Sequence, residues 1–315
     1  MAERPTSPFT AATQALMDNV QRAGFPPIYT LPIEQARQSY KAGVGATAQP
    51  PLPMARVENF HIPGPEGWIP ARLWSASTDP SQPVLLYLHG GGFVIGGIET
   101  CESMCTVLAQ HSGGAVLAID YRLAPEHKFP AGLDDCFAAL QWVANEGHTR
   151  GLDCTRIAVA GDSAGGTLAA STALLARDAG IPLVLQALFY PSVQLDLKTD
   201  SLKAFSANTL LSWELMHWFE KQARGGELRE RWHREPLYAP SHTHVAPAWI
   251  GLAECDPLTD EGHLYAQRLK DAGVPVTVRQ WAGVIHDFIN LGRFLPEAGQ
   301  AHQELAAALK QAYAR

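Results

Sequence analysis

The sequence predicts an α/β protein with a mostly parallel central sheet and helices on both faces. Short, continuously apolar runs, typical of strands buried on both faces, recur along the chain. Runs of helical length separate them, and this alternation is typical of a doubly wound sheet. A glycine-rich turn at residues 161–166 joins one such strand directly to the next helix. A chain of 315 residues is long enough for one such domain with added helical elements.

Each element is expected from its local pattern. Alternating runs at 57–62 and 68–74 flank a Pro- and Gly-rich turn and predict a β-hairpin. Continuously apolar, buried strands are then expected at 84–88 and 115–119, and further strands at 156–160, 183–189, 248–253 and 276–281. Helices are expected at 10–23, 32–42, 99–111, 129–146, 164–179, 212–224, 260–272 and 296–314.

Two segments stand outside this alternation. Residues 1–50 hold two helical runs around a Pro-rich hinge, ahead of the first strand, and predict either a lid or a buttress. Residues 192–240 are rich in tryptophan and contain no core strand, and a stretch of that length favours a covering element over a loop. Residues 51–191 and 241–315 are left for the domain that contains the sheet.

Composition and charge exclude several classes of function. The formal net charge of −7 provides no basic surface, so no nucleic-acid binding is expected. No run approaches the roughly 18 apolar residues of a membrane helix, and the N-terminus lacks the pattern of a secretory signal. Five cysteines, without the spacing of a disulfide scaffold, fit reduced thiols. We therefore expect a soluble cytoplasmic protein that does not insert into membranes.

The motif Gly161-Asp162-Ser163-Ala164-Gly165 carries the first functional signal. Small residues two before and two after Ser163 permit a sharp turn from strand to helix, and such a turn exposes the side chain at its apex. Ser163 is therefore a candidate nucleophile. Taken alone, the motif also fits a glycine-rich turn capped by Asp162 or Ser163 before an ordinary helix.

A second glycine-rich motif, His89-Gly90-Gly91-Gly92-Phe93, directly follows the first buried strand. Consecutive glycines let backbone N–H groups face an anion without obstruction. The N–H groups of Gly91, Gly92 and Ala164 therefore predict an oxyanion hole. A tight turn or a phosphate loop are the alternatives, although the Gly-Lys-Ser/Thr of a P-loop is missing. His89 is expected to orient this loop rather than to titrate.

Asp256 is the candidate acid. It follows the strand at 248–253, on the edge where doubly wound sheets place their sites, and could accept from an imidazole N–H. Glu254 and Glu261 are the alternative acids, and Asp260 is favoured as a helix N-cap.

His286 is the candidate base because it lies between the last strand and the closing helix. The chain order Ser163, Asp256, His286 is the Ser–acid–His order of a hydrolase sheet. In this interpretation, His286 takes the proton of Ser163 Oγ, which attacks a carbonyl carbon to form an acyl-enzyme.

Taken together, these motifs resemble the hormone-sensitive-lipase-like (bacterial family IV) esterases of the α/β-hydrolase fold. The matching segments, in family order, are HGGGF at 89–93, DYRLAPEHKFPA at 120–131, GDSAGG at 161–166, DPLTDEG at 256–262 and the motif around His286. The resemblance implies the triad Ser163–Asp256–His286, the oxyanion hole above, short-to-medium acyl ester substrates, and a helical cap made of residues 1–50 and 192–240. It departs at Asp287, where the family often has glycine; this carboxylate is expected to raise the pKa of His286.

The remaining expectations concern the pocket, partners and rival functions. Phe93, Leu210 and Trp213 are candidate pocket residues, and the charged segment 120–127 is expected to hold the glycine loop. No cofactor is expected, and no metal, because Cys101 and Cys105 lack partner ligands. The expected partner is a small-molecule ester, and a homodimer stays open. The alternatives are an amidase or deacetylase with the same triad, and a non-catalytic small-ligand receptor on this fold.

Overall fold

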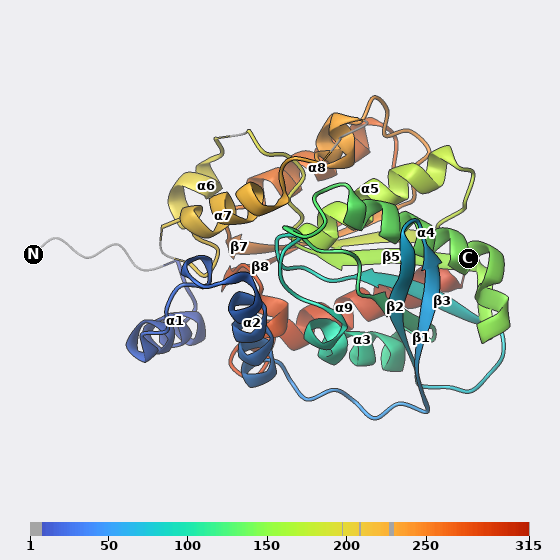
Figure 1. Cartoon of the computed structure of the whole chain (residues 1–315), viewed down its shortest axis with the longest axis horizontal. Coiled ribbons are helices and arrows are strands. Elements are labelled where there is room, and N and C mark those ends of the chain that lie inside the picture. The colour runs from blue at the N-terminus through green and yellow to red at the C-terminus, as the bar shows by residue number, and fades with distance from the viewer. Residues whose placement is uncertain (1–7, 197, 208, 227–229, 315) are drawn as a thin grey trace, which may run out of the picture.

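The computed structural model describes residues 8–196, 198–207, 209–226 and 230–314. Within them, the strands form one sheet with helices on both faces, as the sequence predicts (Figure 1). In spatial order the strands are β1 (Arg56–Gly64), β2 (Gly67–Ser75), β4 (Ala115–Ile119), β3 (Gln82–Leu88), β5 (Leu152–Asp162), β6 (Leu185–Phe189), β7 (Ala248–Cys255) and β8 (Val276–Ile285).

Strand pairing follows the hydrophobic pattern of the sequence. The two alternating strands β1 and β2 form the antiparallel hairpin, with Gly64 opposite Gly67, and β2 pairs antiparallel with β4. The strands β3 to β8 pair in parallel. Their carboxyl ends therefore lie along one edge of the sheet, where the segments containing Ser163, Asp256 and His286 begin.

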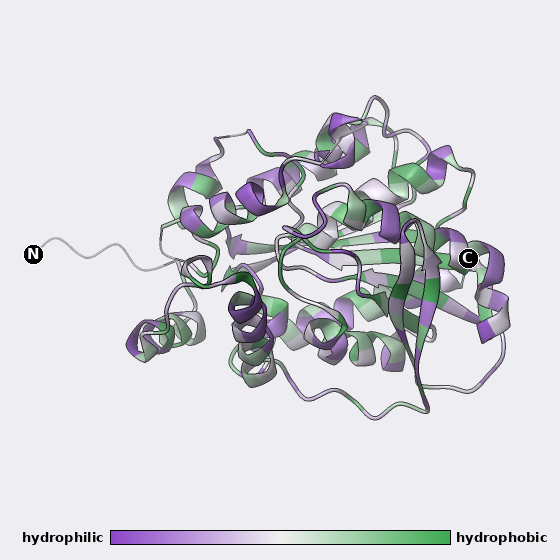
Figure 2. Ribbon diagram, viewed as in Figure 1, coloured by the Kyte–Doolittle hydropathy of each residue, from purple (hydrophilic) through white to green (hydrophobic). Residues whose placement is uncertain are grey.

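Helices cover the sheet as two layers. The helices α4 (Ala131–Glu146), α5 (Ala164–Asp178) and α8 (Thr259–Asp271) pack on one face, and α3 (Ile98–Ser112) and α9 (Pro296–Tyr313) pack on the other (Figure 1). Alternate residues of β3 divide between these layers, because successive strand side chains point to opposite faces. Figure 2 shows hydrophobic residues concentrated along the strands, with hydrophilic residues on the outward sides of the helices.

The two segments outside the alternation gather at one end of the sheet (Figure 1). The N-terminal segment forms α1 (Ala11–Ala23), the 3₁₀ turn η1 (Ile28–Thr30) and α2 (Ile33–Thr47). The later segment forms α6 (Asp200–Phe205) and α7 (Trp213–Ala223), followed by η3 (Arg231–His233) and η4 (Pro236–Tyr238). The remaining 3₁₀ turns are η2 (Gly147–Arg150) and η5 (Phe288–Asn290). None of the helices formed by the described residues combines the length and apolarity needed to span a membrane.

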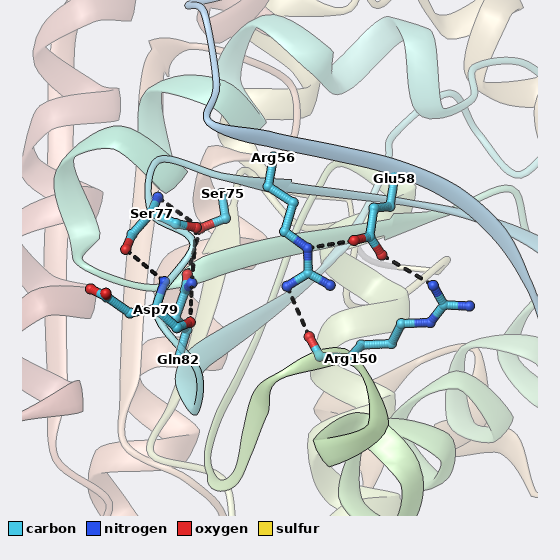
Figure 3. A network of polar contacts seen from close by, with 7 residues as sticks. All are labelled: Arg56, Glu58, Ser75, Ser77, Asp79, Gln82 and Arg150. Atoms are coloured by element: carbon cyan, nitrogen blue, oxygen red, sulfur yellow. Dashed lines mark hydrogen bonds and ion pairs between the residues drawn. The ribbon is translucent and has the colours of Figure 1, made fainter.

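Polar contacts hold the β1–β2 hairpin near the amino ends of the parallel strands (Figure 3). Arg56 Nε donates to Glu58 Oε1 (2.6 Å), and Arg150 Nη1 donates to Glu58 Oε2 (3.1 Å). The hydrogen bond from Arg56 holds the pKa of Glu58 below its usual value. Ser75 Oγ also donates to Gln82 Oε1 (2.5 Å), which ties the end of β2 to the start of β3. This network lies at the edge of the sheet opposite to Ser163.

Some element boundaries differ from the sequence predictions. The helix expected at 32–42 continues through two glycines to Thr47, because Thr47 Oγ1 donates to Asn290 O (2.9 Å) and its own carbonyl accepts from Arg293 N (2.9 Å). These tertiary bonds outweigh the low helix propensity of glycine. The short helix α6 was not predicted. The expectation for Asp260 was wrong: Leu258 is the N-cap of α8, while Asp260 Oδ2 accepts from Ser201 N (2.9 Å).

Candidate active site

Ser163 lies at the apex of the turn between β5 and α5. Its backbone has φ 54° and ψ −119°, a conformation that non-glycine residues seldom adopt. The turn is closed so tightly that a Cβ at Gly161 would clash with Gly165 O, and one at Gly165 would clash with Leu88 O. Only glycine fits both positions, so the sharp turn expected from the spacing of the motif is present.

The structure brings Ser163, His286 and Asp256 into one hydrogen-bonded line. His286 Nε2 lies 2.9 Å from Ser163 Oγ, and His286 Nδ1 lies 2.7 Å from Asp256 Oδ2. The second oxygen of Asp256 accepts from Leu258 N (2.8 Å), so both oxygens have partners. The Asp256 side chain is fully buried, whereas Ser163 stays partly exposed.

The two alternative acids have other partners. Glu254 Oε2 accepts from Gly283 N (2.7 Å) and fixes the bulged end of β8. Glu261 Oε2 accepts from Val193 N (2.8 Å), at the start of the later outside segment. Both carboxylates therefore hold backbone, and Asp256 is the one in contact with the imidazole.

Charges around His286 favour its protonated form. Burial alone would lower the pKa of His286, but the nearby carboxylates Asp256, Asp287 and Asp162 outweigh burial and raise that pKa above its ordinary value. The direction expected for Asp287 from the sequence is therefore present. Burial also raises the pKa of Asp287 and that of Asp162 to about 6 in each case.

Gly91 and Gly92 form the turn beside Ser163. Both have positive φ, 109° and 60°, and Gly91 O accepts from Val94 N and Ile95 N (3.0 Å each). A glycine suits these positions because side chains rarely tolerate such backbone angles. Among the described residues, the N–H groups of Gly91, Gly92 and Ala164 have no protein acceptor. These three donors are thus available to a ligand oxygen.

His89 and Asp162 hold the glycine turn in place. His89 Nδ1 lies 2.7 Å from Gly90 O, and the ring stacks on Tyr121 with centroids 4.3 Å apart. Burial lowers the pKa of His89, which favours a neutral ring. Asp162 Oδ1 accepts from Gly90 N (3.0 Å) and from Tyr87 Oη (2.5 Å), so it links the two glycine motifs. Sequence reasoning considered Asp162 only as a cap, although its place beside Ser163 was a signal.

The charged segment after β4 makes the loop-holding contacts expected of it. Ile98 N donates to Asp120 Oδ1 (2.7 Å), and Ala124 N donates to Phe93 O (2.9 Å). The Arg122 guanidinium contacts the buried carboxylate of Asp135 through Nε and Nη2, at 2.8–3.0 Å. These bonds connect the segment to the start of α3, to the glycine loop and to α4.

The three candidate pocket residues have different environments. Phe93 is 6% exposed, with its ring edge-on to Phe129 (5.5 Å) and the Arg234 guanidinium 4.4 Å from its centroid. Leu210 packs partly buried against the apolar cluster beside α3 and α9, and Trp213 is 56% exposed. A surface groove of about 760 Å³ between α6 and α8 includes none of these residues and no triad residue. The pocket assignment stays a prediction.

Two aromatic residues that sequence reasoning did not assign to the site lie against it. The Tyr190 ring, directly after β6, has its centroid 4.5 Å from that of His286. The Phe219 ring, from α7, covers Gly92 so closely that a Cβ there would clash with it. The position of Tyr190 at the carboxyl end of a parallel strand was a usable signal, whereas nothing in the sequence pairs Phe219 with Gly92.

The cysteines on α3, the residues considered as possible metal ligands, lie outside the triad. Cys101 and Cys105 are buried free thiols on α3. Within the described ranges, no group of three or more His, Cys, Asp and Glu side chains could hold a metal ion.

A nucleophile-bearing turn, a Ser–His–Asp line and free N–H donors at the carboxyl edge of a parallel sheet define the class of α/β hydrolases. A profile of the family described as alpha/beta hydrolase fold matches residues 85–290. The chain belongs to this family, in its hormone-sensitive-lipase-like branch, as the sequence motifs predict.

Curated relatives and solved structures are similar over most of the chain. Esterase LipI of Mycobacterium tuberculosis is 40% identical over 270 residues, 83% of this chain and 84% of the relative. The ethyl acetate hydrolase of Pseudomonas putida is 32% identical over 316 residues, and the match covers 97% of this chain and 98% of the relative. An ester hydrolase from the metagenome of Lake Arreo superposes with a TM-score of 0.93 at 37% identity, covering 98% of this chain and all of that chain. The predicted enzyme class, a carboxylic ester hydrolase, is confirmed.

Proposed function

We propose that Ser163, His286 and Asp256 form the catalytic triad of a serine carboxylesterase. The observation that carries this proposal is the line of contacts from Ser163 Oγ to His286 Nε2 (2.9 Å) and from His286 Nδ1 to Asp256 Oδ2 (2.7 Å). Neutral His286 takes the Ser163 proton as Oγ attacks the ester carbonyl, and Asp256 stabilises the resulting imidazolium. The imidazolium then protonates the leaving alkoxide, and the same imidazole activates water to release the acid.

The N–H groups of Gly91, Gly92 and Ala164 serve as the oxyanion hole in this proposal. Within the described residues, these N–H groups have no acceptor. They lie beside Ser163 and are held by backbone turns rather than by mobile side chains. Such donors require no reorganisation as charge develops on the carbonyl oxygen, and each contributes about 10²–10³ in rate. His89 acts as the loop-orienting residue through its bond to Gly90 O.

The triad assignment is tested by covalent trapping. A p-nitrophenyl alkylphosphonate should add one phosphonyl group per chain, located on Ser163 by peptide mass spectrometry. His286→Ala should slow this labelling by about 10³-fold or more, since the serine loses its base. Stoichiometric labelling at any other residue would overturn the assignment.

Short-to-medium acyl esters are the proposed substrates. The relative from Pseudomonas putida is named an ethyl acetate hydrolase, and in this chain Phe219 lies directly over Gly92, which limits the room beside the proposed oxyanion hole. Residues 1–50 and 192–240 are proposed to form the cap over the site; of these, positions 1–7, 197, 208 and 227–229 lie outside the described residues. Small esters, a cytoplasmic location and a homodimer all stay predictions for this chain.

Acyl length is tested with p-nitrophenyl acetate, butyrate, octanoate and palmitate. We expect kcat/KM to be highest within the first three and to fall by about tenfold or more at palmitate, because a long chain must displace packed aromatic side chains. Phe219→Ala should shift the preference toward longer chains if that ring limits the space. A flat profile, or a maximum at palmitate, would contradict this substrate range.

Ester and amide hydrolysis are separated by matched substrates. An amidase or deacetylase with the same triad would hydrolyse p-nitroacetanilide at a rate comparable to p-nitrophenyl acetate. We expect the ester to react faster by about 10³-fold or more, because an amine leaving group demands stronger acid assistance. Similar kcat/KM values for the two substrates would favour the amidase.

The activity should depend on pH through His286. The base must be neutral, and its raised pKa places the rise of kcat/KM above pH 6.5, with activity lost as the pH falls. Asp287→Asn removes one of the three facing carboxylates (Asp256, Asp287 and Asp162), so the rise should move to lower pH by roughly half a unit to one unit. Asp260→Asn, whose carboxylate instead accepts from Ser201 N, is the matched control and should leave the profile in place. An unchanged profile in Asp287→Asn would contradict this role.

A further inference from the structure

Helix α2 joins two loops of the proposed catalytic machinery. Arg37, Tyr40 and Thr47 are spaced by three and seven residues, so they lie on one face of the helix. At one end this face meets the oxyanion turn, defined here as residues 89–95. At the other end it meets the histidine loop, residues 286–293. These two loops come from opposite halves of the chain.

Arg37 holds the oxyanion turn by its backbone. Its Nε donates to Val94 O (2.9 Å), and its Nη2 donates to Ala124 O (3.0 Å). Val94 N in turn donates to Gly91 O (3.0 Å). A single residue, Val94, therefore links the Arg37 guanidinium to Gly91, whose N–H is a proposed oxyanion donor. Two bonds to Glu126, of 3.0 and 2.6 Å, orient the planar guanidinium. This fork geometry fixes direction as well as distance.

Tyr40 and Thr47 hold the histidine loop. Tyr40 Oη donates to Asp287 Oδ2 (3.3 Å), at the residue directly after His286. Asp287 is buried in the left-handed region, φ 68°, and its other oxygen accepts from Asn290 Nδ2 (2.7 Å). About two helical turns further along the same face, Thr47 Oγ1 donates to Asn290 O (2.9 Å). The loop is thereby fixed to α2 at both ends of η5.

We propose that Arg37 and Tyr40 are positioning residues for ester hydrolysis, and that α2 is a strut that sets the separation between the oxyanion turn and the histidine loop. The inference rests on the proposed triad and oxyanion hole. Neither residue touches the reacting atoms; each acts through a loop that does. A shift of about 1 Å between base and oxyanion donors can lower turnover by about 10²-fold, so a rigid connection between them has a measurable effect.

A double-mutant cycle tests the strut. Arg37→Gln and Tyr40→Phe should each lower kcat by about tenfold on p-nitrophenyl butyrate with KM changed less than about twofold, because ground-state binding of a small ester does not depend on the separation of the loops. The kcat of the double variant should be no lower than that of the more impaired single variant, because α2 released from one loop can no longer fix the separation of the two loops. Multiplying losses, or an unchanged kcat in both single variants, would overturn the proposal.

Matched controls separate positioning from general destabilisation. Gln38→Ala removes an exposed contact to Glu34 on another face of the same helix and should leave kcat unchanged. If Arg37→Gln does not fold, Arg37→Lys, which keeps the charge but has a single donor nitrogen in place of the guanidinium fork, replaces it in the cycle with the same expected non-additivity.

Phosphonate labelling distinguishes failure of the strut from failure of the triad. In the strut variants we expect one phosphonyl group on Ser163, added about tenfold more slowly than in the parent, because the oxyanion donors are displaced from the attacked oxygen. Parent chain that is not labelled at Ser163 would refute the proposed triad. Variants labelled at the parent rate, on a parent labelled at Ser163, would refute the strut alone.

Discussion

Ser163→Ala is expected to lower kcat/KM for p-nitrophenyl butyrate by about 10⁴-fold or more, because no other group can form the acyl-enzyme. His286 and Asp256 would keep their 2.7 Å contact, and the oxyanion donors would stay in place, so a small residual rate above the uncatalysed one is expected. Alanine is the smallest change that keeps a Cβ at this strained backbone position. Thermal unfolding of the variant should therefore stay close to that of the parent.

The control for this prediction is Ser103→Ala on α3, which should retain full activity. Kinetics at saturating ester and stopped-flow measurement of the p-nitrophenol burst are the readouts. Turnover in Ser163→Ala within about a hundredfold of the parent, in protein shown to be free of parent contamination, would be incompatible with an acyl-enzyme on Ser163.

Asp256→Asn is expected to lower kcat by about 10⁴-fold through the wrong tautomer of His286. Leu258 N donates to Asp256 Oδ1 (2.8 Å), which would hold the asparagine oxygen on that side and turn its NH₂ group toward His286 Nδ1. The imidazole would then carry its proton on Nε2 and could no longer accept one from Ser163. Since the side chain is isosteric, KM and the fold should change little.

The matched variant is Glu254→Gln, two residues from Asp256. Its oxygen can still accept from Gly283 N, so kcat should stay within about threefold of the parent. The two variants together separate the acid of the triad from a neighbouring carboxylate that holds backbone. Equal losses in both, or a larger loss in Glu254→Gln, would contradict the choice of Asp256.

Much of the fold could be predicted because its signals are local. A strand such as β4 was expected at 115–119 and occurs there, since a continuous apolar run between turn residues has few other stable solutions. The hairpin is of the same kind, with alternation on either side of a short turn. The sequence predictions were wrong where contacts with residues distant in the chain determine the local structure. Helix α2 continues past its two glycines because the histidine loop binds its last turn. Asp260 accepts a hydrogen bond from Ser201 N instead of capping its own helix.

The candidate site was partly readable for the same reason. Ser163, Asp256 and His286 were singled out by short motifs and by their order, and the structure places them in contact. Phe219 over Gly92, Tyr190 beside His286 and the two ends of α2 could not be read in this way. Each depends on a pairing between segments that no local pattern encodes.

By itself the amino-acid sequence determined the α/β class, the hydrolase family and the residues proposed as nucleophile and base, because spacing, hydrophobic period and glycine positions constrain the chain within one element and its adjoining turn. Only the tertiary structure decided which carboxylate meets the imidazole, which side chains press on the glycine turn, and that α2 spans two loops. Those outcomes depend on distances of a few ångströms between segments up to 247 residues apart. Such distances are set by the packing of the whole sheet and its helices.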